Sequence, residues 1–296
     1  MRRRRARERD AAGRWATPVL AASALTVLLI ACALSPLATL PGGEWELAAQ
    51  GPTVRYLVRP GHEPVEDPEV ALARLEAFLA DVGPAWYVPA ELRYFAFADR
   101  ETLRADTGWD ITGRAILDRD AVVSIYAADA HEVAHILTAP HGRPLRLANF
   151  WLEGIAMYYT WPEVFFGEDG AGDRPRRMGT WHGRSVHDWT QTALQAGELV
   201  PLERLVHGNA AWGQLDDGVS YPLAGSFVTH LLGPGHRDLE RIAALRAFFD
   251  EANAAADRTA VLDAFERHLG LPLAEAEAAW LEFLAEWDEE SLSGEN

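Results

Sequence analysis

The chain has 296 residues, of which 49% are hydrophobic and 24% are charged. This composition supplies enough apolar material for a sizeable core and excludes low-complexity, collagen-like and coiled-coil architectures. The formal net charge is −17, and every basic residue is Arg. An acidic chain repels phosphate backbones, so nucleic acid is not expected as a partner. Cys32 is the only cysteine, which excludes an intrachain disulfide and a cysteine-based zinc site.

The N-terminal segment has the pattern of a membrane-targeting sequence. Seven Arg fall within the first 14 residues, and residues 19–35 (VLAASALTVLLIACALS) are almost wholly apolar. Extended to residues 16–40, the apolar run reaches the length of about 20 residues that a bilayer needs. A buried core helix would not directly follow an N-terminal Arg cluster. We therefore expect a basic cytoplasmic segment over residues 1–15 and a transmembrane anchor over residues 16–40.

A lipoprotein signal is the alternative to the anchor. Residues 29–32 (LIAC) resemble a bacterial lipobox, which implies cleavage before Cys32 and lipidation of its thiol. The sequence stays apolar after Cys32, where a lipoprotein usually turns polar, and this favours the anchor. In both cases the body of the protein is expected outside the cytoplasm and tethered to a membrane.

A small α/β part is expected over residues 51–128, after a linker at residues 41–50. Pro68 suits the first turn of a helix, and Gly83 with the proline after it ends that helix. Helical and period-two spacing predict the elements of this part. The predicted helices are residues 68–82 and 101–106, and the predicted strands are residues 54–58, 92–98, 114–117 and 122–127.

From Asp129 to about residue 290 the pattern is mostly helical. Residues 161–187 interrupt it and are predicted to form a long loop, which in compact domains is typical of functional or mobile segments. Residues 291–296 are expected to be a disordered, solvated tail. The predicted helices are residues 129–138, 147–160, 188–196, 222–233, 237–254, 258–268 and 273–288. The fold class is therefore α+β, a small mixed sheet followed by a mostly helical part.

The first of these helices carries the sequence HEVAH, an H-E-x-x-H motif. His131 and His135 lie one turn apart on the same helix face, so both imidazoles can bind one metal ion. Glu132 lies beside the first of them and can reach a water on the metal without binding the metal itself. This geometry is typical of a zinc hydrolase, in which Zn²⁺ acidifies a water and the Glu takes its proton.

A third ligand is available on the next helix, 18 residues past His135. HEVAH followed by WLEGIAMYY resembles the gluzincin metallopeptidases, the clan of thermolysin and the zinc aminopeptidases. The resemblance covers about residues 120–290 and implies a zincin-like fold. It also implies that His131, His135 and Glu153 hold Zn²⁺, and that Glu132 is the general base and acid.

The resemblance has further consequences around the third ligand. Gly154 and Ala156 are small enough to let the two ligand helices approach closely. Residues 122–127 correspond to the edge strand with which an extended peptide pairs in this clan. The thermolysin branch has an Asp one turn beyond the Glu ligand to orient a zinc-binding His, and no Asp follows Glu153 at that distance. The clan's motif for gripping a substrate amino terminus is not visible either.

The segment VSYPLAGSFV at residues 219–228 resembles one found in bacterial gluzincin-like peptidases, where an aromatic residue opens a helix beside the zinc site. In the aminopeptidase branch a Tyr at a comparable distance after the Glu ligand stabilises the oxyanion. The resemblance therefore implies Tyr221 as the oxyanion donor, with His230 on the same helix as the alternative.

His141 is a rival third ligand. It follows the second His by six residues, which is the metzincin spacing. That family has Gly where this chain has Thr138, because the backbone turns sharply there, and a β-branched Thr is poorly suited to a positive φ. Glu153 is therefore preferred, and His141 is otherwise expected in a loop near the mouth of the site.

The expected function is that of a membrane-anchored, extracytoplasmic zinc metallopeptidase acting on a peptide or protein substrate. One alternative is a catalytically inactive, membrane-tethered binding protein on a peptidase-like scaffold, with no zinc or with its open position blocked by a side chain such as His141 or His182. Another is a metal-free helical envelope protein in which HEVAH is a coincidence. The sequence names neither a particular substrate nor an oligomeric state.

Overall fold

The computed structural model describes residues 40–62, 65–141, 144–160, 180–182, 184–233 and 238–287. All of these lie in the second of the two units into which its contacts divide the chain, residues 32–296. The predicted basic segment, the predicted anchor or lipoprotein signal up to residue 39, and the predicted tail lie outside the described residues. Within the described ranges, no helix is both long enough and apolar enough to span a membrane.

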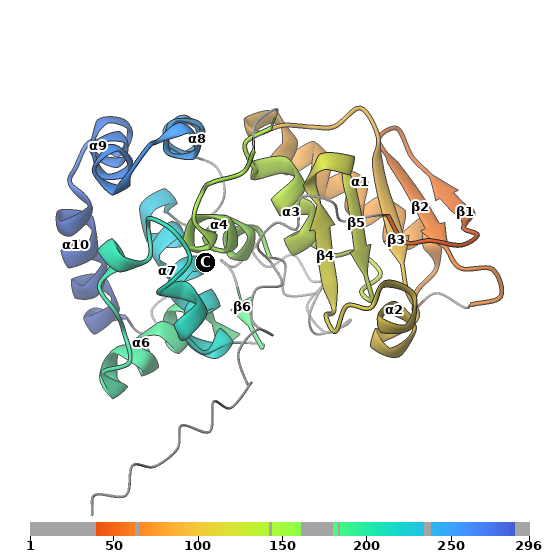
Figure 1. Cartoon of the computed structure of the whole chain (residues 1–296), viewed down its shortest axis with the longest axis horizontal. Coiled ribbons are helices and arrows are strands. Elements are labelled where there is room, and N and C mark those ends of the chain that lie inside the picture. Colours follow the sequence, from red (N-terminus) through yellow and green to blue (C-terminus); the bar gives the residue numbers. More distant parts are fainter. Residues whose placement is uncertain are drawn as a thin grey trace, which may run out of the picture. The chain divides into compact units, whose positions relative to one another are not determined.

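A five-stranded mixed sheet forms the first part of the described chain (Figure 1). Its order is β1-β2-β3-β5-β4, in which β2, β3 and β5 are parallel while the two edge strands pair antiparallel with their neighbours. The strands are β1 (Glu46–Gln50), β2 (Val54–Val58), β3 (Leu92–Ala96), β4 (Gly113–Ile116) and β5 (Ala121–Ser124). The predicted mixed sheet is therefore confirmed.

β1 occupies residues that the sequence placed in a linker. A tight turn joins it to β2, closed by a hydrogen bond from the N–H of Gly51 to the carbonyl of Val54 (2.9 Å). β1 pairs with β2 with an irregular register between Leu47 and Ala49. The alternation of apolar and polar residues expected of a strand is weak in ELAAQ. The hairpin turn that follows it is the sequence signal for the edge strand β1.

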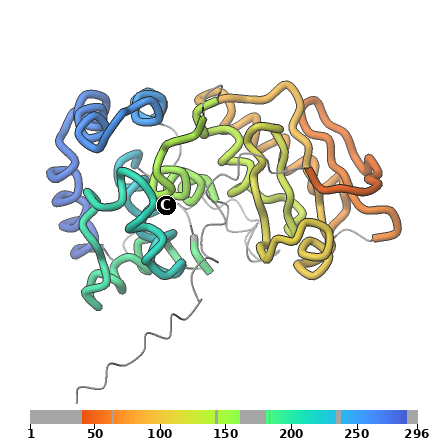
Figure 2. The backbone as a smooth tube through the Cα atoms, viewed as in Figure 1, coloured from red at the N-terminus to blue at the C-terminus, as the bar shows by residue number. Residues whose placement is uncertain are grey.

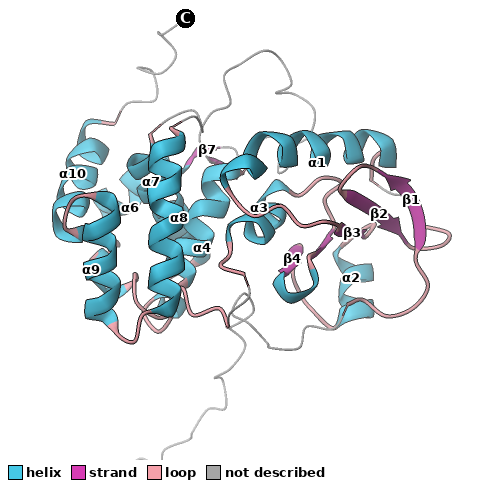
Figure 3. Cartoon of the chain, turned by 90° about the horizontal axis from the view of Figure 1, so that it is seen from above, coloured by secondary structure: helices cyan, strands magenta, loops and turns pink. Residues whose placement is uncertain are grey.

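The two faces of the sheet pack against different helices (Figure 3). One face packs against α1 (Pro68–Val82) and the apolar side of α3 (Ala130–Thr138), and the other packs against α2 (Arg100–Thr107). Along β2, Tyr56 belongs to the first buried cluster and Leu57 to the second. Strands covered on both faces are apolar on both sides, as this sequence is.

The ends of α1 follow from residues identified in the sequence. Pro68 is its first residue, and the side chain of Asp67 accepts a hydrogen bond from the N–H of Glu69 (2.8 Å). The helix ends at Val82, and Gly83 begins a single 3-10 turn. The other 3-10 turns among the described residues are Leu117–Arg119, Leu202–Arg204 and Trp212–Gln214.

The second part of the described chain is helical, as predicted. Its later helices are α6 (Val186–Ala196), α7 (Asp217–Leu232), α8 (Leu239–Ala254), α9 (Arg258–Leu269) and α10 (Leu273–Glu286). α4 (Asn149–Tyr159) lies between the sheet and these helices, and all of its residues are buried (Figures 1 and 2). A helix that is buried all round is apolar on every face, which explains the near-continuous hydrophobic sequence of α4.

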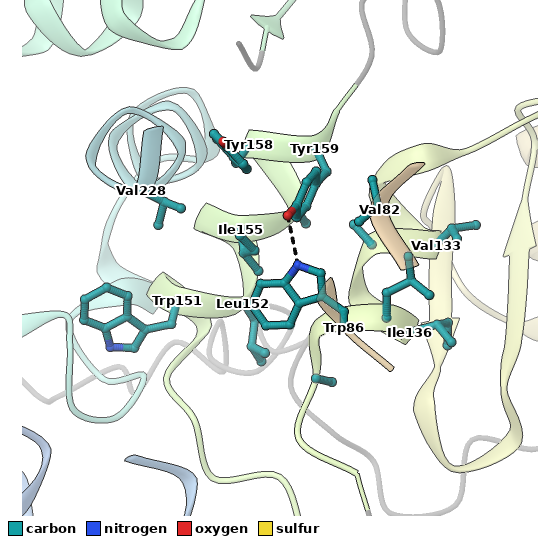
Figure 4. Close-up of a cluster of buried hydrophobic side chains, with 14 of the residues drawn as sticks. Val82, Trp86, Val133, Ile136, Trp151, Leu152, Ile155, Tyr158, Tyr159 and Val228 are labelled. Carbon is teal, nitrogen blue, oxygen red and sulfur yellow. Dashed lines mark hydrogen bonds between the residues drawn. The ribbon is translucent and has the colours of Figure 1, made fainter. Parts of the chain in front are cut away.

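A buried cluster connects α4 to the sheet side of the chain (Figure 4). The indole Nε1 of Trp86 donates to the hydroxyl of Tyr159 at 2.9 Å, which satisfies both polar atoms inside an apolar surrounding. Val133 and Ile136 of α3 belong to the same core as Ile155 of α4. α3 and α4, the two helices that carry the H-E-x-x-H motif and Glu153, are therefore packed into one core.

Two glycines let α4 and α7 pack closely. A Cβ on Gly154 would lie 2.7 Å from Cγ2 of Val228 and 2.8 Å from the backbone oxygen of Ala224, and one on Gly225 would lie 2.7 Å from Cβ of Met157. The expectation that Gly154 serves the contact between the two ligand helices is therefore wrong. It serves the contact between α4 and α7.

The predicted loop at residues 161–187 is only partly described, since residues 161–179 lie outside the described ranges. The remainder is a short hairpin of β6 (Thr180–Trp181) and β7 (Arg184–Ser185), followed at once by α6. α6 begins two residues earlier than predicted because Ser185 caps it. α7 begins five residues earlier than predicted because Asp216 caps it, and Pro222 lies inside the helix.

Candidate metal centre

Two tyrosines of the sheet hold the turn that precedes α3. The rings of Tyr56 and Tyr94 stack with centroids 5.3 Å apart. The Tyr56 hydroxyl donates to the carbonyl of Ala127 (3.0 Å). The Tyr94 hydroxyl donates to the carbonyl of Tyr126 (2.7 Å) and accepts from the N–H of Asp129 (2.9 Å). The position at which α3 begins is therefore fixed by β2 and β3.

Asp129 caps the N-terminus of α3. One of its oxygens accepts from the N–H of Glu132 (3.2 Å), and the other accepts from the hydroxyl of Ser124 at the end of β5 (2.7 Å). Because the cap is itself bound to the sheet, the rotation of α3 about its axis is set by β5. This arrangement directs one face of the HEVAH helix towards α4.

His131, His135 and Glu153 form a group that could hold a metal ion. Their nearest ligand atoms all lie within 4.8 Å of one another. Oε2 of Glu153 is 3.2 Å from Nε2 of His131 and 3.3 Å from Nε2 of His135. His131 is 7% exposed and Glu153 2% exposed, so the group is nearly withdrawn from solvent. Two imidazole nitrogens and one carboxylate oxygen form a donor set that divalent transition metals favour.

The same three residues hold one another electrostatically. Burial alone would raise the pKa of Glu153, but the charge of His135 and hydrogen bonds from both histidines outweigh it and lower this pKa to about 2. Burial alone would lower the pKa of His131, but the hydrogen bond and charge of Glu153 outweigh it and raise this pKa to about 9. A buried carboxylate between two histidines is thus kept ionised and ready to accept a cation.

Thr160, which follows the last residue of α4, contacts the far side of His131. Its Oγ1 lies 3.3 Å from Nδ1 of His131 and donates a hydrogen bond to the carbonyl of Ala156 (2.9 Å). The sequence lacks the Asp that the thermolysin branch has one turn beyond the Glu ligand, and Thr160 was not identified as a group in its place. A signal for it exists, because Thr160 lies two turns beyond Glu153 on the same helix face.

Glu132 lies beside the ligand group without belonging to it. Its Oε2 accepts a hydrogen bond from the N–H of Ala115 in β4 (2.7 Å). Burial, reinforced by the negative charge of Asp129, raises the pKa of Glu132 from 4.5 to about 7. A Cβ on Gly113 would lie 2.9 Å from Cγ of Glu132, so only a glycine lets β4 run this close.

The edge of the sheet next to α3 is β4 and not β5. The expectation that residues 122–127 form the peptide-pairing edge strand is wrong, because β5 lies between β3 and β4. The physical reason is that residues 113–124 form a hairpin whose first strand takes the outer position. The N–H of Ala115 points away from β5, towards Glu132.

Tyr221 lies in the second turn of α7, close to the ligand group. Its ring centroid is 6.2 Å from that of His131. The ring stacks on Trp181 of β6 with centroids 5.0 Å apart, and Trp212 lies 5.8 Å away. The side chain implied as an oxyanion donor is therefore at the site, within a wall of aromatic rings.

The other histidines considered in the sequence are outside the ligand group found among the described residues. Nε2 of His141 donates to the carbonyl of Ile136 (2.7 Å), and its ring lies on Tyr87. Thr138 ends α3 without a positive φ, so the metzincin turn is not made. His182 is exposed, and the ring of His230 packs against Phe283 of α10.

Comparisons with known proteins assign this chain to no family. A scan against models of protein families found no match, and a search of curated proteins found none either.

Proposed function

We propose that this chain is a zinc-dependent metallopeptidase of the gluzincin type, with a zincin-like fold. The observation that supports it best is the buried group of His131, His135 and Glu153 with Glu132 beside it. The donor set fits Zn²⁺, which takes His nitrogen and carboxylate oxygen in sites of three protein ligands and one open position. When bound, the zinc ion would polarise a carbonyl and lower the pKa of a water.

The remaining chemistry belongs to side chains of this chain. Glu132 accepts the proton of the attacking water and returns it to the leaving amine. The N–H of Ala115 holds one oxygen of Glu132, which fixes the direction of its carboxylate. Tyr221 donates a hydrogen bond to the oxygen that becomes negative when water adds to the peptide bond. An extended peptide substrate pairs with the edge strand β4 through backbone groups other than the N–H of Ala115, which is bound to Glu132.

The membrane assignment is part of the same proposal and rests on the sequence alone. Residues 16–40 anchor the chain and the peptidase body lies outside the cytoplasm, with lipid attachment at Cys32 as the alternative. A catalytically inactive binding protein on the same scaffold is the second candidate. That protein would hold no zinc, or zinc with its open position blocked by a side chain. His141 and His182, the two side chains considered for blocking, lie outside the ligand group found among the described residues.

The test is the zinc content and peptidase activity of the purified full-length chain, with Glu153→Ala and His141→Ala as a matched pair. We expect about one zinc per chain in the parent and in His141→Ala, and none in Glu153→Ala. We also expect the parent to cleave members of a peptide library. Zinc without cleavage would favour the binding protein, and a parent without zinc would refute the metal centre.

A further inference from the structure

The ring of a metal-binding His needs a partner on its far nitrogen, which sets its orientation and decides which nitrogen faces the metal. One turn beyond Glu153 the chain has Met157, whose side chain is fully buried and packs towards Gly225 of α7. A carboxylate is therefore absent from the place where the gluzincin resemblance would put one. The hydroxyl of Thr160 is the group that contacts His131 instead.

The hydrogen bonds of Thr160 determine the direction of its contact with His131. A carbonyl oxygen can only accept, so the single hydroxyl hydrogen of Thr160 is directed to the carbonyl of Ala156 (2.9 Å). The hydroxyl oxygen is then an acceptor for His131, so Nδ1 of His131 (3.3 Å away) carries a hydrogen and donates it to Thr160. Nε2 lies 3.2 Å from the carboxylate of Glu153, and its hydrogen is the one that a metal ion would replace.

We propose that Thr160 is a positioning residue for the metal centre. Its hydroxyl fixes the tautomer and the ring plane of His131 so that Nε2 is presented to the ion. Thr160 is 2% exposed, so water cannot replace its hydroxyl at this position. The inference rests on the metal centre of the proposed function and is independent of whether peptides are cleaved.

The matched variants are Thr160→Val, which removes the hydroxyl and keeps the shape, and Thr160→Ser, which keeps the hydroxyl. Thr190→Val is the control, because Thr190 is equally buried and donates the same kind of bond to a carbonyl one turn back in α6 (2.6 Å). We expect Thr160→Val to weaken zinc binding by about 10- to 100-fold, the usual cost of losing such a partner. Thr160→Ser and Thr190→Val should stay within about threefold of the parent.

Zinc affinity is measured by competition with a chromophoric chelator on the full-length chain in detergent. A second readout is the ¹⁵N spectrum of the zinc-loaded protein labelled at histidine. For His131 the parent and Thr160→Ser should show a protonated Nδ1 and a metal-bound Nε2, and Thr160→Val should lose the single well-defined signal. Thermal unfolding of the zinc-free forms shows whether each variant is folded.

Each outcome decides the proposal. If Thr160→Val binds zinc as tightly as the parent, or if Thr160→Ser loses as much affinity as Thr160→Val, the hydroxyl has no positioning role. A parent that binds zinc but cleaves no peptide refutes the peptidase function and leaves the role of Thr160 standing. A parent that binds no zinc overturns both.

Discussion

Two buried histidines of this chain differ in what they contact, and the contact decides their charge. His131 faces the carboxylate of Glu153, whereas His187 in α6 faces the hydroxyl of Ser226 (2.8 Å) and the aromatic rings of Phe283 and Trp287. Burial, followed by the positive charge of His230, lowers the pKa of His187 to about 3. His187 is thus a neutral core residue, whereas His131 carries a proton beside Glu153 and must release it when a metal ion binds.

The low pKa of His187 predicts a loss of stability in mild acid. Its ordinary pKa is 6.5, so below pH 6.5 the unfolded chain binds a proton that the folded chain does not take up until about pH 3. The contribution of His187 to the free energy of unfolding is therefore constant above pH 6.5. Between pH 6.5 and pH 3 it falls by about 1.4 kcal/mol for each pH unit of acidification. Urea unfolding of the parent and His187→Asn between pH 7 and pH 4 should show a flatter pH dependence for the variant. Equal slopes would contradict this account.

Glu132→Gln separates the metal from the chemistry of the proposed peptidase. The amide oxygen can still accept from the N–H of Ala115, and none of the three ligands is changed, so zinc content should equal that of the parent. An amide cannot take a proton from water, and the rate of peptide cleavage should fall by about 10²- to 10⁴-fold. Cleavage at the parent rate would remove Glu132 from its proposed role.

At the residue scale the ligand group, Glu132 and Tyr221 could be predicted from the sequence, whereas the contacts made by Thr160 and by the backbone of Ala115 could not. Helical periodicity alone places His131 and His135 on one face, and the WLEG segment supplies Glu153, so the sequence identifies all three members of the group. Thr160 was missed because its hydroxyl can take the place of a carboxylate only if the end of α4 lies beside the ring of His131, and the sequence does not show that contact. The bond from Ala115 to Glu132 is a backbone contact that no residue type reveals.

At the scale of elements, the contact between α4 and α7 makes a direct prediction. Gly154→Ala would place a methyl group 2.8 Å from the backbone oxygen of Ala224, which cannot move without displacing α7. We expect the free energy of unfolding to fall by about 1–3 kcal/mol, as for other overpacked cores.

Gly213→Ala is the control for this change, because a Cβ there meets nothing within 4 Å and the residue has no positive φ. Chemical denaturation of both variants and the parent measures the difference. A Gly154→Ala variant as stable as Gly213→Ala would show that the two helices can separate at little cost.

Most elements begin and end within a few residues of their predicted bounds, because capping residues and prolines mark them. α1 keeps its predicted bounds, since Asp67 and Pro68 start it and Gly83 follows it. Among the predicted helices, α7 differs most from its predicted start. Proline is typical of the first turn of a helix, and yet Pro222 lies inside α7. The order of strands in a sheet depends on pairing between residues that are distant in sequence, which local sequence patterns do not reveal. For this reason the edge was predicted at β5, although β4 occupies it.

At the scale of the whole molecule, the ligand group joins the two helices that link the sheet to the helical part. Zinc that binds only the folded chain should add about 2.7 kcal/mol of stability at a free concentration of 100 times its Kd. For a chain of 296 residues that corresponds to a rise in Tm of roughly 4–5 °C. Calorimetry with zinc and with a chelator measures the shift, and Glu153→Ala should show none. A Tm that is the same with zinc and with chelator in the parent would contradict a metal centre here.

The stacked tyrosines below α3 have a consequence for how this protein can be divided. None of the three ligand residues belongs to the sheet, yet Tyr56 and Tyr94 decide where the helix with two of them starts. The helical part is therefore not a self-sufficient module that could be excised, transplanted or fused elsewhere with its site intact. Any exchange of the N-terminal half for another scaffold must bring the same two hydroxyl groups to the same turn.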